Sequence, residues 1–400
     1  MEDHFISLDK IFYSGIISLY GASVLDLSEV INYLIKYWSK TPKHTAGEIL
    51  GSMTTHPHWL SIYAFNLFIH TNLADPVIFR EIAYFEEDLV NDLSSLYRSE
   101  EPAGFITSGG TESNIIALYI ARKLYGDEKN KVVLAPITVH KSIDKGCEIL
   151  GLKLIKTDIN SDYKASVQDL EEKISRYKPI AVVITAGTTD FGTLDPIKEV
   201  NELACKYDFY LHIDAAYGGL LIPFIWSERD LEKLEFLNGI SSISIDFHKN
   251  GLCPIPSGLI LFRNKYLEKQ AYFNMPYMPA KFQKGLLGTR PGASAAACWA
   301  IWKLLGINGF KELAKRIVSL ADYLYEKLKS LDRVKPIIKP KLGIVSFKIY
   351  GYEVDEVLPL FWRNRLFIYR TSFLNALRVA IMPHVKREHL DKLVDFIKEL

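Results

Sequence analysis

The stretch IAVVITAGTTDFGTLDPIKEVNELACKYDFYLHID, residues 180–214, indicates the fold of this chain. It contains two short β-rich runs, 180–185 and 209–214, on either side of the helix-like segment 196–207. A strand, a helix and a second strand in this order are typical of a mainly parallel sheet that is covered on both faces. We therefore expect an α/β fold.

The same alternation extends outward from this stretch. Further β-rich runs occur at 132–135, 153–156, 240–246 and 258–262, and further helix-like segments at 140–150 and 166–177. Apolar residues at helical spacing also predict helices at 26–38 and 79–97. Parallel sheets bind their ligands at the carboxyl ends of strands, so we expect a site in the loops that follow these runs.

After about Gly288 the pattern changes to that of a smaller α+β unit. A long helix-like run at 293–330 is followed by strand-like runs at 343–349 and 377–382 and by a final helix near 386–399. We expect three parts, namely an N-terminal helical arm at 1–50, a large domain at 51–288 and a small C-terminal domain at 289–400.

Composition excludes several classes of protein. The 400 residues are 48% hydrophobic and 24% charged, and the net charge of +1 gives no field that favours nucleic acid or an anionic membrane. The four cysteines lie far apart without zinc-type spacing, which is typical of buried thiols in a reducing compartment. No apolar run approaches the ~20 residues that span a bilayer. We expect a cytoplasmic protein with no nucleic-acid or membrane partner.

The segment TSGGTESN, residues 107–114, precedes an apolar-periodic helix. Small residues and hydroxyls at a helix start expose backbone N–H groups at the positive end of the helix dipole, where a phosphate binds well. The segment lacks the GK[ST] ending of a Walker loop. The alternative is a glycine turn with a Thr or Ser cap.

Two further segments follow predicted strands. In HIDAAYGG (212–219) Asp214 can point into a cleft, although a helix-capping or surface carboxylate is the alternative. In SISIDFHKNG (242–251) a desolvated Lys249 would have a lowered pKa and would be a usable amine nucleophile. The alternative there is an ordinary surface lysine.

The combination of these segments predicts a pyridoxal 5'-phosphate enzyme. This cofactor needs a phosphate site, an anion beside its pyridine nitrogen, a stacking ring and an imine-forming lysine. The chain supplies Ser108–Thr111, Asp214, His140 and Lys249 in that order. A carboxylate beside the pyridine nitrogen keeps it protonated, so that the ring acts as an electron sink. His140 is also compatible with an ordinary loop histidine.

Five motifs closely resemble those of the group II pyridoxal-phosphate decarboxylases. They are TSGGTESN, HKSIDKG (140–146), TAGTTDFGTLDPI (185–197), HIDAAYGG and SISIDFHKNGLCPIPSG (242–258). The branch that they resemble is that of the archaeal L-tyrosine/L-aspartate decarboxylases, and the resemblance runs from about Gly51 to the C-terminus. It implies the fold-type I, aminotransferase-like architecture and a homodimer with its active sites at the subunit interface.

The resemblance also implies roles for individual residues. Lys249 matches the Schiff-base lysine, Asp214 the partner of the pyridine nitrogen, and His140 the residue stacked on the ring. The other matches to cofactor-binding positions are Ser108, Gly109, Gly110, Thr111, Thr189, Ala216, Asp246 and His248. Thr189 is also implied to lie near the substrate carboxylate.

Two more positions match residues that act on the substrate. Tyr277 resembles a mobile-loop tyrosine that protonates the substrate carbon, often in the neighbouring subunit's site; the alternative is an ordinary buried tyrosine. Arg378 resembles the arginine that pairs with the substrate α-carboxylate. Independently, an arginine flanked by apolar strand residues needs an anion if it is buried. Asn250 departs from the apolar residue that usually follows the His-Lys pair, which bears on substrate preference.

We therefore predict decarboxylation of an aspartate-like or tyrosine-like L-amino acid to the amine and CO₂. Aspartate would need a second cation for its side-chain carboxylate, whereas tyrosine would need an apolar slot. One alternative is an aldehyde-lyase resembling the sphingosine-phosphate lyases, which share a GTRPGA-like segment (288–293). The other is a non-catalytic binding protein that has kept the fold. His56 and His58 have no third ligand in the sequence pattern, so we expect a substrate-pocket role there and no metal.

Overall fold

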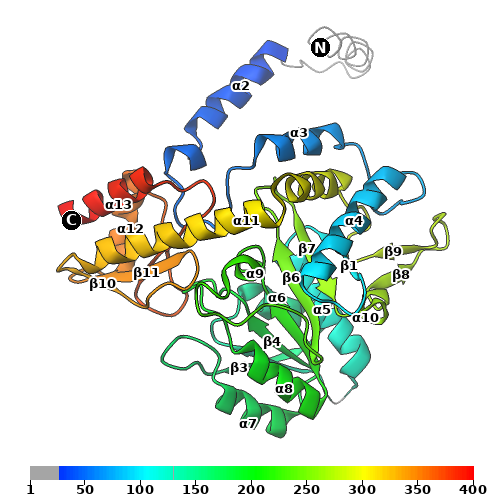
Figure 1. Ribbon diagram of the computed structural model, residues 1–400. Coiled ribbons are helices and arrows are strands. Elements are labelled where there is room, and N and C mark those ends of the chain that lie inside the picture. Colours follow the sequence, from blue (N-terminus) through cyan, green and yellow to red (C-terminus); the bar gives the residue numbers. More distant parts are fainter. Residues whose placement is uncertain (1–26, 129) are drawn as a thin grey trace. The chain divides into compact units, whose positions relative to one another are not determined.

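The computed structural model describes residues 27–128 and 130–400, and the chain divides into two compact units at Lys43 (Figure 1). In the first unit the helix expected at 26–38 is confirmed as α2 (Leu27–Lys40), none of whose residues is buried. Residues 1–26 of the expected N-terminal arm lie outside the described residues.

The second unit contains a seven-stranded sheet in the order β1-β7-β6-β5-β4-β2-β3. Its strands are β1 (Gly104–Thr107), β2 (Val132–Pro136), β3 (Lys153–Thr157), β4 (Ala181–Thr185), β5 (Tyr210–Asp214), β6 (Ile240–Asp246) and β7 (Gly258–Phe262). Strands β3, β2, β4, β5 and β6 pair in parallel, whereas β7 runs antiparallel to both of its neighbours. The predicted α/β fold with a mainly parallel sheet is confirmed.

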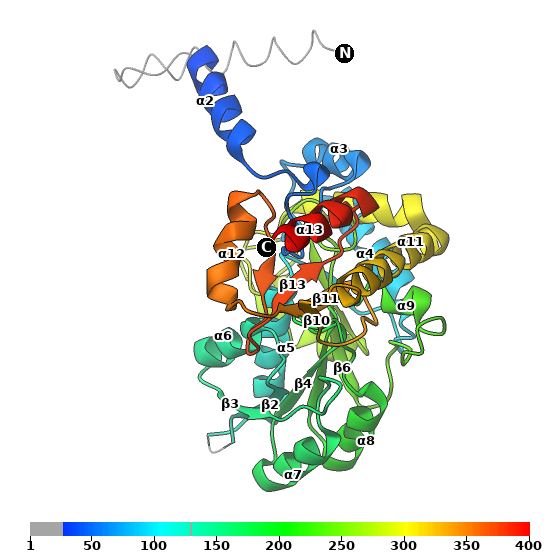
Figure 2. The same ribbon diagram turned by 90° about the vertical axis from the view of Figure 1, so that its left-hand side faces the viewer.

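Helices cover both faces of this sheet (Figures 1 and 2). Successive strand residues point to opposite faces, and both sets are apolar. Val183 belongs to the core formed with α5 (Gly110–Tyr125) and α6 (Lys141–Leu150). Its neighbour Ile184 belongs to the core on the opposite face, with α7 (Val167–Tyr177) and α8 (Ile197–Tyr207). Burial on both faces explains the continuous apolar run of this strand.

The C-terminal part contains the predicted smaller α+β unit. Its antiparallel sheet has the order β10-β11-β13-β12, and its elements are α11 (Gly292–Lys329), β10 (Val334–Pro336), β11 (Ile344–Ile349), α12 (Val354–Arg363), β12 (Tyr369–Arg370), β13 (Leu377–Ala380) and α13 (Arg387–Glu399). Ile344 and Phe347 share one core with Ile184 of the large sheet. The two sheets therefore share one hydrophobic core. The domain boundaries at 51 and 289 stay predictions.

The remaining elements connect or flank these layers. They are the 3-10 turn η1 (His44–Ala46), α3 (Trp59–Leu67), α4 (Arg80–Leu96), α9 (Ile222–Ile225), α10 (Lys265–Lys269), β8 (Tyr272–Asn274) and β9 (Phe282–Lys284). No helix among the described residues is long and apolar enough to cross a membrane. Cys147, Cys253 and Cys298 are buried as expected, but Cys205 is exposed because it lies on the outer side of α8.

A buried ion pair fixes β1 just before the predicted phosphate-binding turn. Arg290 Nη1 lies 2.7 Å from Glu86 Oε1, and both side chains bond the peptide groups of Ile106. Although burial acts to raise the pKa of Glu86, Arg290 and Lys284 hold that pKa below its usual value. The pair therefore joins α4, β1 and the start of α11.

Replacing one member of this pair is expected to destabilise the protein strongly. An Arg290→Met variant leaves a buried carboxylate without its main partner, which should cost about 3–5 kcal/mol of unfolding free energy. A Glu86→Leu/Arg290→Met double variant removes both charges and should regain most of that loss. Urea unfolding of the three proteins measures the difference, and a double variant no more stable than the single one would contradict this account.

Candidate active site

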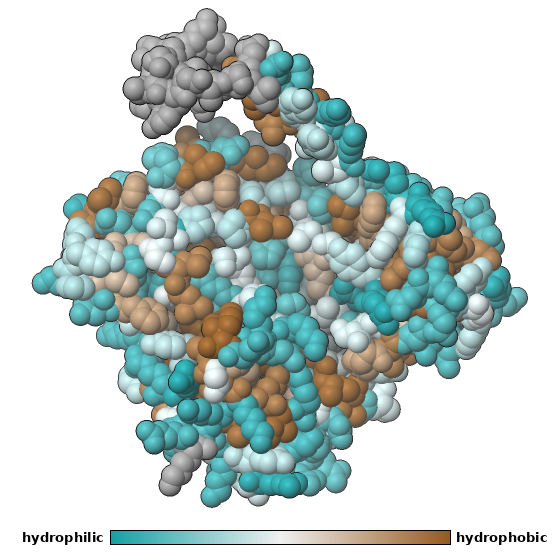
Figure 3. All heavy atoms as spheres, turned by 180° about the vertical axis from the view of Figure 1, so that it is seen from behind, coloured by the Kyte–Doolittle hydropathy of each residue, from teal (hydrophilic) through white to brown (hydrophobic). Residues whose placement is uncertain are grey.

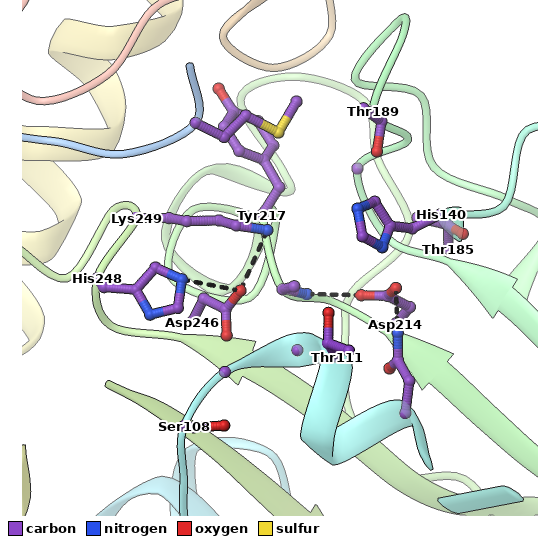
Figure 4. A pocket seen from close by; sticks show the side chains of 16 residues that line it. Ser108, Thr111, His140, Thr185, Thr189, Asp214, Tyr217, Asp246, His248 and Lys249 are labelled. Carbon is purple, nitrogen blue, oxygen red and sulfur yellow. Dashed lines mark hydrogen bonds and ion pairs between the residues drawn. The ribbon is translucent and has the colours of Figure 1, made fainter. Parts of the chain in front are cut away.

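The carboxyl ends of β1, β4, β5 and β6 border one cavity (Figure 4). The strand register brings these ends together, since Asp214 pairs with both Thr185 and Ser244. The cavity is lined by all of the residues predicted to bind the cofactor, namely Ser108, Gly109, Gly110, Thr111, His140, Thr189, Asp214, Ala216, Asp246, His248 and Lys249. Segments more than 100 residues apart in the chain thus converge on one place.

The turn of Gly109 and Gly110 joins β1 to α5. Gly109 has a φ of 149°, and a Cβ atom there would lie 2.8 Å from His248 Cε1. A Cβ atom at Gly110 would lie 2.9 Å from that of Ala216. Neither position has space for a side chain. The N–H groups of the first turn of α5 have no partner within the helix and carry the positive end of its dipole, which suits a phosphate group.

Lys249 follows β6 and points into the cavity (Figure 4). Its Nζ lies 3.1 Å from Asp246 Oδ2, and 18% of its side chain is exposed. His248 Nε2 lies 3.5 Å from the same oxygen. Burial lowers the pKa of His248, so its ring is neutral near pH 7 and Lys249 is the cation that pairs with Asp246. An amine in this position can react with a molecule in the cavity.

Asp214 ends β5 and is only 4% exposed. Its Oδ2 accepts a hydrogen bond from Asn114 Nδ2 at 2.8 Å, and its Oδ1 accepts one from the Ala216 N–H at 3.1 Å. Burial acts to raise the pKa of this carboxyl, but His140, Lys249 and the Asn114 hydrogen bond together hold the pKa below its usual value. Asp214 is therefore a buried anion with a fixed orientation.

His140 precedes α6 and lies across the cavity from Lys249 in Figure 4. Its Nδ1 accepts a hydrogen bond from the Ser142 N–H at 3.2 Å, which caps the helix and fixes the ring. The ring is open to the cavity on one side, yet desolvation by the surrounding protein lowers its pKa. A neutral, fixed imidazole is suited to stacking on an aromatic ring.

The structure does not bring Arg378 or Tyr277 to the lining of this cavity. Arg378 lies on β13, 5% exposed, where its Nη1 donates to the Thr189 carbonyl at 2.7 Å and its Nη2 to the Gly51 carbonyl at 3.0 Å. Tyr277 lies between β8 and β9 and is 79% exposed, with its hydroxyl bonded to Met275 Sδ. The buried-tyrosine alternative is therefore wrong, and the roles of both residues stay predictions.

Sequence reasoning missed several residues that line the cavity, which are Met53, Asn114, Thr185, Gly187 and Tyr217. Four of them lie inside motifs that the sequence analysis quotes, so the signal was present but carried no assignment to a role. Met53 lies in GSMTTHPHWL (51–60), the stretch that also holds His56 and His58 and was expected to line the substrate pocket, but Met53 itself was not singled out.

The structure does not place His56 or His58 among the residues that line the cavity, so the substrate-pocket role expected for them stays a prediction. His56 Nδ1 lies 2.9 Å from the Pro57 carbonyl, and His58 Nδ1 accepts a hydrogen bond from the Leu60 N–H. Within residues 27–128 and 130–400, no group of three or more His, Cys, Asp or Glu side chains is placed to hold a metal ion.

Polar atoms without partners indicate what the cavity can bind. Among the described residues, Thr185 Oγ1, Asp246 Oδ1 and Arg378 Nε are buried and have no hydrogen-bond partner. The glycine turn, Lys249 and Asp214 match a phosphate, an aldehyde and a pyridine nitrogen, so the residues present fit pyridoxal phosphate. The fold and the site together define a pyridoxal-phosphate enzyme.

Comparison with known proteins gives the family. Residues 26–350 match the model of the pyridoxal-dependent decarboxylase conserved domain. The chain belongs to this pyridoxal-dependent decarboxylase family, and it is an amino-acid decarboxylase with pyridoxal 5'-phosphate as cofactor. The predicted family, cofactor and reaction type are confirmed, and the match favours a decarboxylase over the aldehyde-lyase and the non-catalytic alternatives.

Two relatives and one solved structure illustrate the similarity. The chain is 40% identical to a probable L-tyrosine/L-aspartate decarboxylase of Methanothermobacter thermautotrophicus, over 88% of this chain and 96% of the relative. It is 39% identical to the L-aspartate decarboxylase of Thermococcus kodakarensis, over 89% and 92%. A sphingosine-1-phosphate lyase of Burkholderia pseudomallei superposes with a TM-score of 0.85 over 96% of this chain and 93% of that one, at 21% identity, which shows the fold alone.

Proposed function

We propose that the chain decarboxylates L-aspartate, with L-tyrosine as the second candidate substrate. The names of both relatives include aspartate, and one also includes tyrosine. The observation that carries the choice is the composition of the cavity wall: of the sixteen lining residues, Met53 and Tyr217 are the large apolar or aromatic ones apart from histidine. A wall that is mostly small and polar favours a short carboxylate side chain over a phenol ring.

Each residue of the site has a proposed task. Pyridoxal phosphate, when bound, withdraws electrons from the substrate carbon and so permits loss of CO₂. Lys249 would hold the cofactor through its aldehyde, and its amine would be the group that displaces the product amine. Asp214 keeps a proton on the pyridine nitrogen, and His140 excludes water from one face of the ring.

Arg378 is proposed to position the substrate α-carboxylate. Its Nε lacks a partner, and its Nη1 bonds the carbonyl of Thr189, which lines the cavity. An Arg378→Gln variant should lower kcat/KM by about 10- to 100-fold, as expected for one lost charge-assisted hydrogen bond. Arg370→Gln is the matched control. Arg370 lies on β12, in the same sheet as Arg378, but its side chain pairs with the exposed Asp355 of α12. Equal effects of the two substitutions would contradict the assignment.

The substrate is tested by incubating the pure protein with each of the twenty amino acids and measuring CO₂ and amine. Aspartate should yield β-alanine, and tyrosine should yield tyramine. The larger kcat/KM for aspartate supports the proposal, whereas tyramine as the dominant product makes tyrosine the substrate. Amine from neither compound would reject both.

A homodimer is proposed to complete the site. Ser61 and Ala64 of α3 are buried, but Trp59, Tyr63 and Leu67 on its other face are 69%, 60% and 55% exposed. Helices that are apolar all round are normally buried, so this face needs a second surface. Brown apolar side chains also lie among the teal ones in the rear view of Figure 3. The cavity supports this too, since Lys249 is its one lysine or arginine among the described residues. The side-chain carboxylate of an aspartate substrate therefore needs a cation from outside this cavity wall, which a second subunit could supply. A cytoplasmic location is a separate prediction.

A subunit-mixing experiment tests whether Tyr277 acts in the partner's site. Tyr277→Phe and Lys249→Ala proteins should each lose at least about 100-fold in activity. If Tyr277 serves the neighbouring subunit, each mixed dimer contains one complete site, so random re-assembly should restore about one quarter of wild-type activity. Mixing that restores nothing, while mass measurement shows mixed dimers, would place Tyr277 in its own subunit's site or outside catalysis.

A further inference from the structure

Asn114 lies at the centre of a buried hydrogen-bond chain beneath the cavity. Its side chain is 1% exposed. Its Nδ2 donates to Asp214 Oδ2 and to Ser142 Oγ, both at 2.8 Å. Its Oδ1 lies 2.8 Å from His212 Nε2 and 3.2 Å from Ser244 Oγ. One amide thus connects three strands or helices that meet under the site.

The chemistry of these groups fixes the orientation of the amide and the tautomer of His212, whereas the Ser244 hydroxyl can donate either to Asn114 Oδ1 at 3.2 Å or to Asp214 Oδ1 at 3.3 Å. An ionised carboxylate only accepts hydrogen bonds, so the Asn114 atom that faces Asp214 is the NH₂ group and Oδ1 faces His212. His212 must then carry its hydrogen on Nε2. Its Nδ1, 2.8 Å from Ser242 Oγ, accepts from that hydroxyl, which in turn accepts from Tyr210 at 2.9 Å. Burial lowers the pKa of His212 to about 4, in agreement with a neutral ring.

The second branch leads to His140. Ser142 Oγ accepts from Asn114, so the hydroxyl hydrogen of Ser142 is directed to His140 Nδ1, 2.9 Å away. The Ser142 N–H donates to the same nitrogen. His140 Nδ1 therefore holds no hydrogen, and the neutral ring carries its hydrogen on Nε2, at the other side of the ring.

We propose that Asn114 is a positioning residue that sets the protonation of Asp214 and of His140 together. Its NH₂ group stabilises Asp214 as an anion and, by donating to Ser142 Oγ, directs the Ser142 hydroxyl hydrogen to His140 Nδ1, where it reinforces the Ser142 N–H in favouring the Nε2–H tautomer. The inference rests on the proposed roles of Asp214 and His140 toward the cofactor. The two groups that would contact the pyridine ring of a bound cofactor would then both depend on one buried amide.

No other side chain of similar size meets these demands. Aspartate at this position would place a second carboxylate 2.8 Å from Asp214 Oδ2 and would repel it. Leucine has a similar volume but offers neither donor nor acceptor, so it would leave His212 and Asp214 with unmet hydrogen bonds. Only an amide donates twice and accepts twice at these four contacts.

The test compares Asn114→Leu and Asn114→Asp with wild type in the full chain. The control is Asn201→Leu, because Asn201 Oδ1 bonds the Gly239 N–H away from the cavity. Pyridoxal phosphate affinity is measured by absorbance titration, and the histidine tautomers by ¹⁵N NMR of protein with labelled histidine. Asn114→Leu should weaken cofactor binding by about 10- to 100-fold, and Asn114→Asp by at least as much. In wild type, His140 and His212 should both show an unprotonated Nδ1, and in Asn114→Leu part of the His140 population should move its hydrogen to Nδ1.

Two results would overturn the proposal. One is an Nδ1–H tautomer of His140 or His212 in the wild-type protein without cofactor. The other is an Asn114→Leu protein with wild-type cofactor affinity, or with a loss no greater than that of an equally destabilised Asn201→Leu protein. A wild-type chain that binds no pyridoxal phosphate would instead refute the assigned roles of Asp214 and His140, and the tautomers still report on the hydrogen-bond chain.

Discussion

A Lys249→Ala variant is expected to fold, to lose covalent attachment of pyridoxal phosphate and to lose decarboxylase activity. The Lys249 amine lies in the same cavity as Asp214, with Asp246 at 3.1 Å. A reacting amine held in the correct place has an effective molarity of at least about 10⁵ M, which free amines in solution do not reach. Activity should therefore fall by more than about 10³-fold. Stability should fall as well, because Lys249→Ala leaves the buried Asp246 carboxylate without its cation, so the activity of the variant is measured on protein shown to be folded.

Borohydride reduction followed by intact mass measurement checks this expectation. Wild-type protein should gain the mass of one reduced cofactor per chain, and Lys249→Ala should gain none. The control is Lys145→Ala, because Lys145 is exposed near the cavity and should leave the labelling unchanged. Equal labelling of Lys249→Ala and wild type would show that another amine carries the cofactor.

The convergence of the predicted site could be anticipated from the sequence because each motif follows a strand. The strand ends at Asp214 and Asp246 were predicted correctly, since β-rich runs locate the ends of strands well. Strand direction was not predictable in this way. A short apolar run gives no sign of its partner, so the antiparallel pairing of β7 became clear only in the structure, and strand β1 at the sheet edge was not predicted at all.

Asn114 shows why the deeper part of the site escaped sequence reasoning. It follows Thr111, Glu112 and Ser113 in the first turns of α5, where polar residues are common. Its partners His212 and Ser142 are 98 and 28 residues away in the chain. No spacing rule joins positions at such separations. A role for this amide follows only when the contacts are known.

Arg378 and Tyr277 illustrate a different limit. The sequence indicated only that Arg378 would need an anion if it was buried; it could not indicate that the residue is buried or that the backbone carbonyls of Thr189 and Gly51 take two of its donors. The prolines that flank Tyr277 indicated an irregular segment. In the structure Tyr277 lies in the turn between β8 and β9, and it is 79% exposed. The proposed action of Tyr277 in a neighbouring subunit therefore depends on the proposed homodimer, which a single sequence does not describe.

An Asp214→Asn variant is expected to lose about 10²- to 10³-fold in kcat/KM, because the pyridine nitrogen then faces a neutral amide in place of a buried anion. The folded pKa of Asp214 lies below its usual 3.8. The carboxylate is therefore charged at both pH 6 and pH 8, and its stabilising contribution is lost only as pH falls through the folded pKa. The activity defect of Asp214→Asn should thus have the same size at pH 6 and at pH 8.

Asp195→Asn is the matched control for this prediction. Asp195 is also a buried carboxylate, in the loop between β4 and α8. It accepts hydrogen bonds from the Thr185 and Ala165 N–H groups and does not line the cavity. Burial raises the pKa of Asp195 to about 6. Its folded state therefore holds a proton more tightly than the unfolded state, so loss of the carboxyl should affect stability more at low pH than at high pH. An Asp214→Asn defect that shrinks toward pH 6 as well would mean that a neutral group suffices beside the pyridine nitrogen, and the electrostatic role of Asp214 would have to be abandoned.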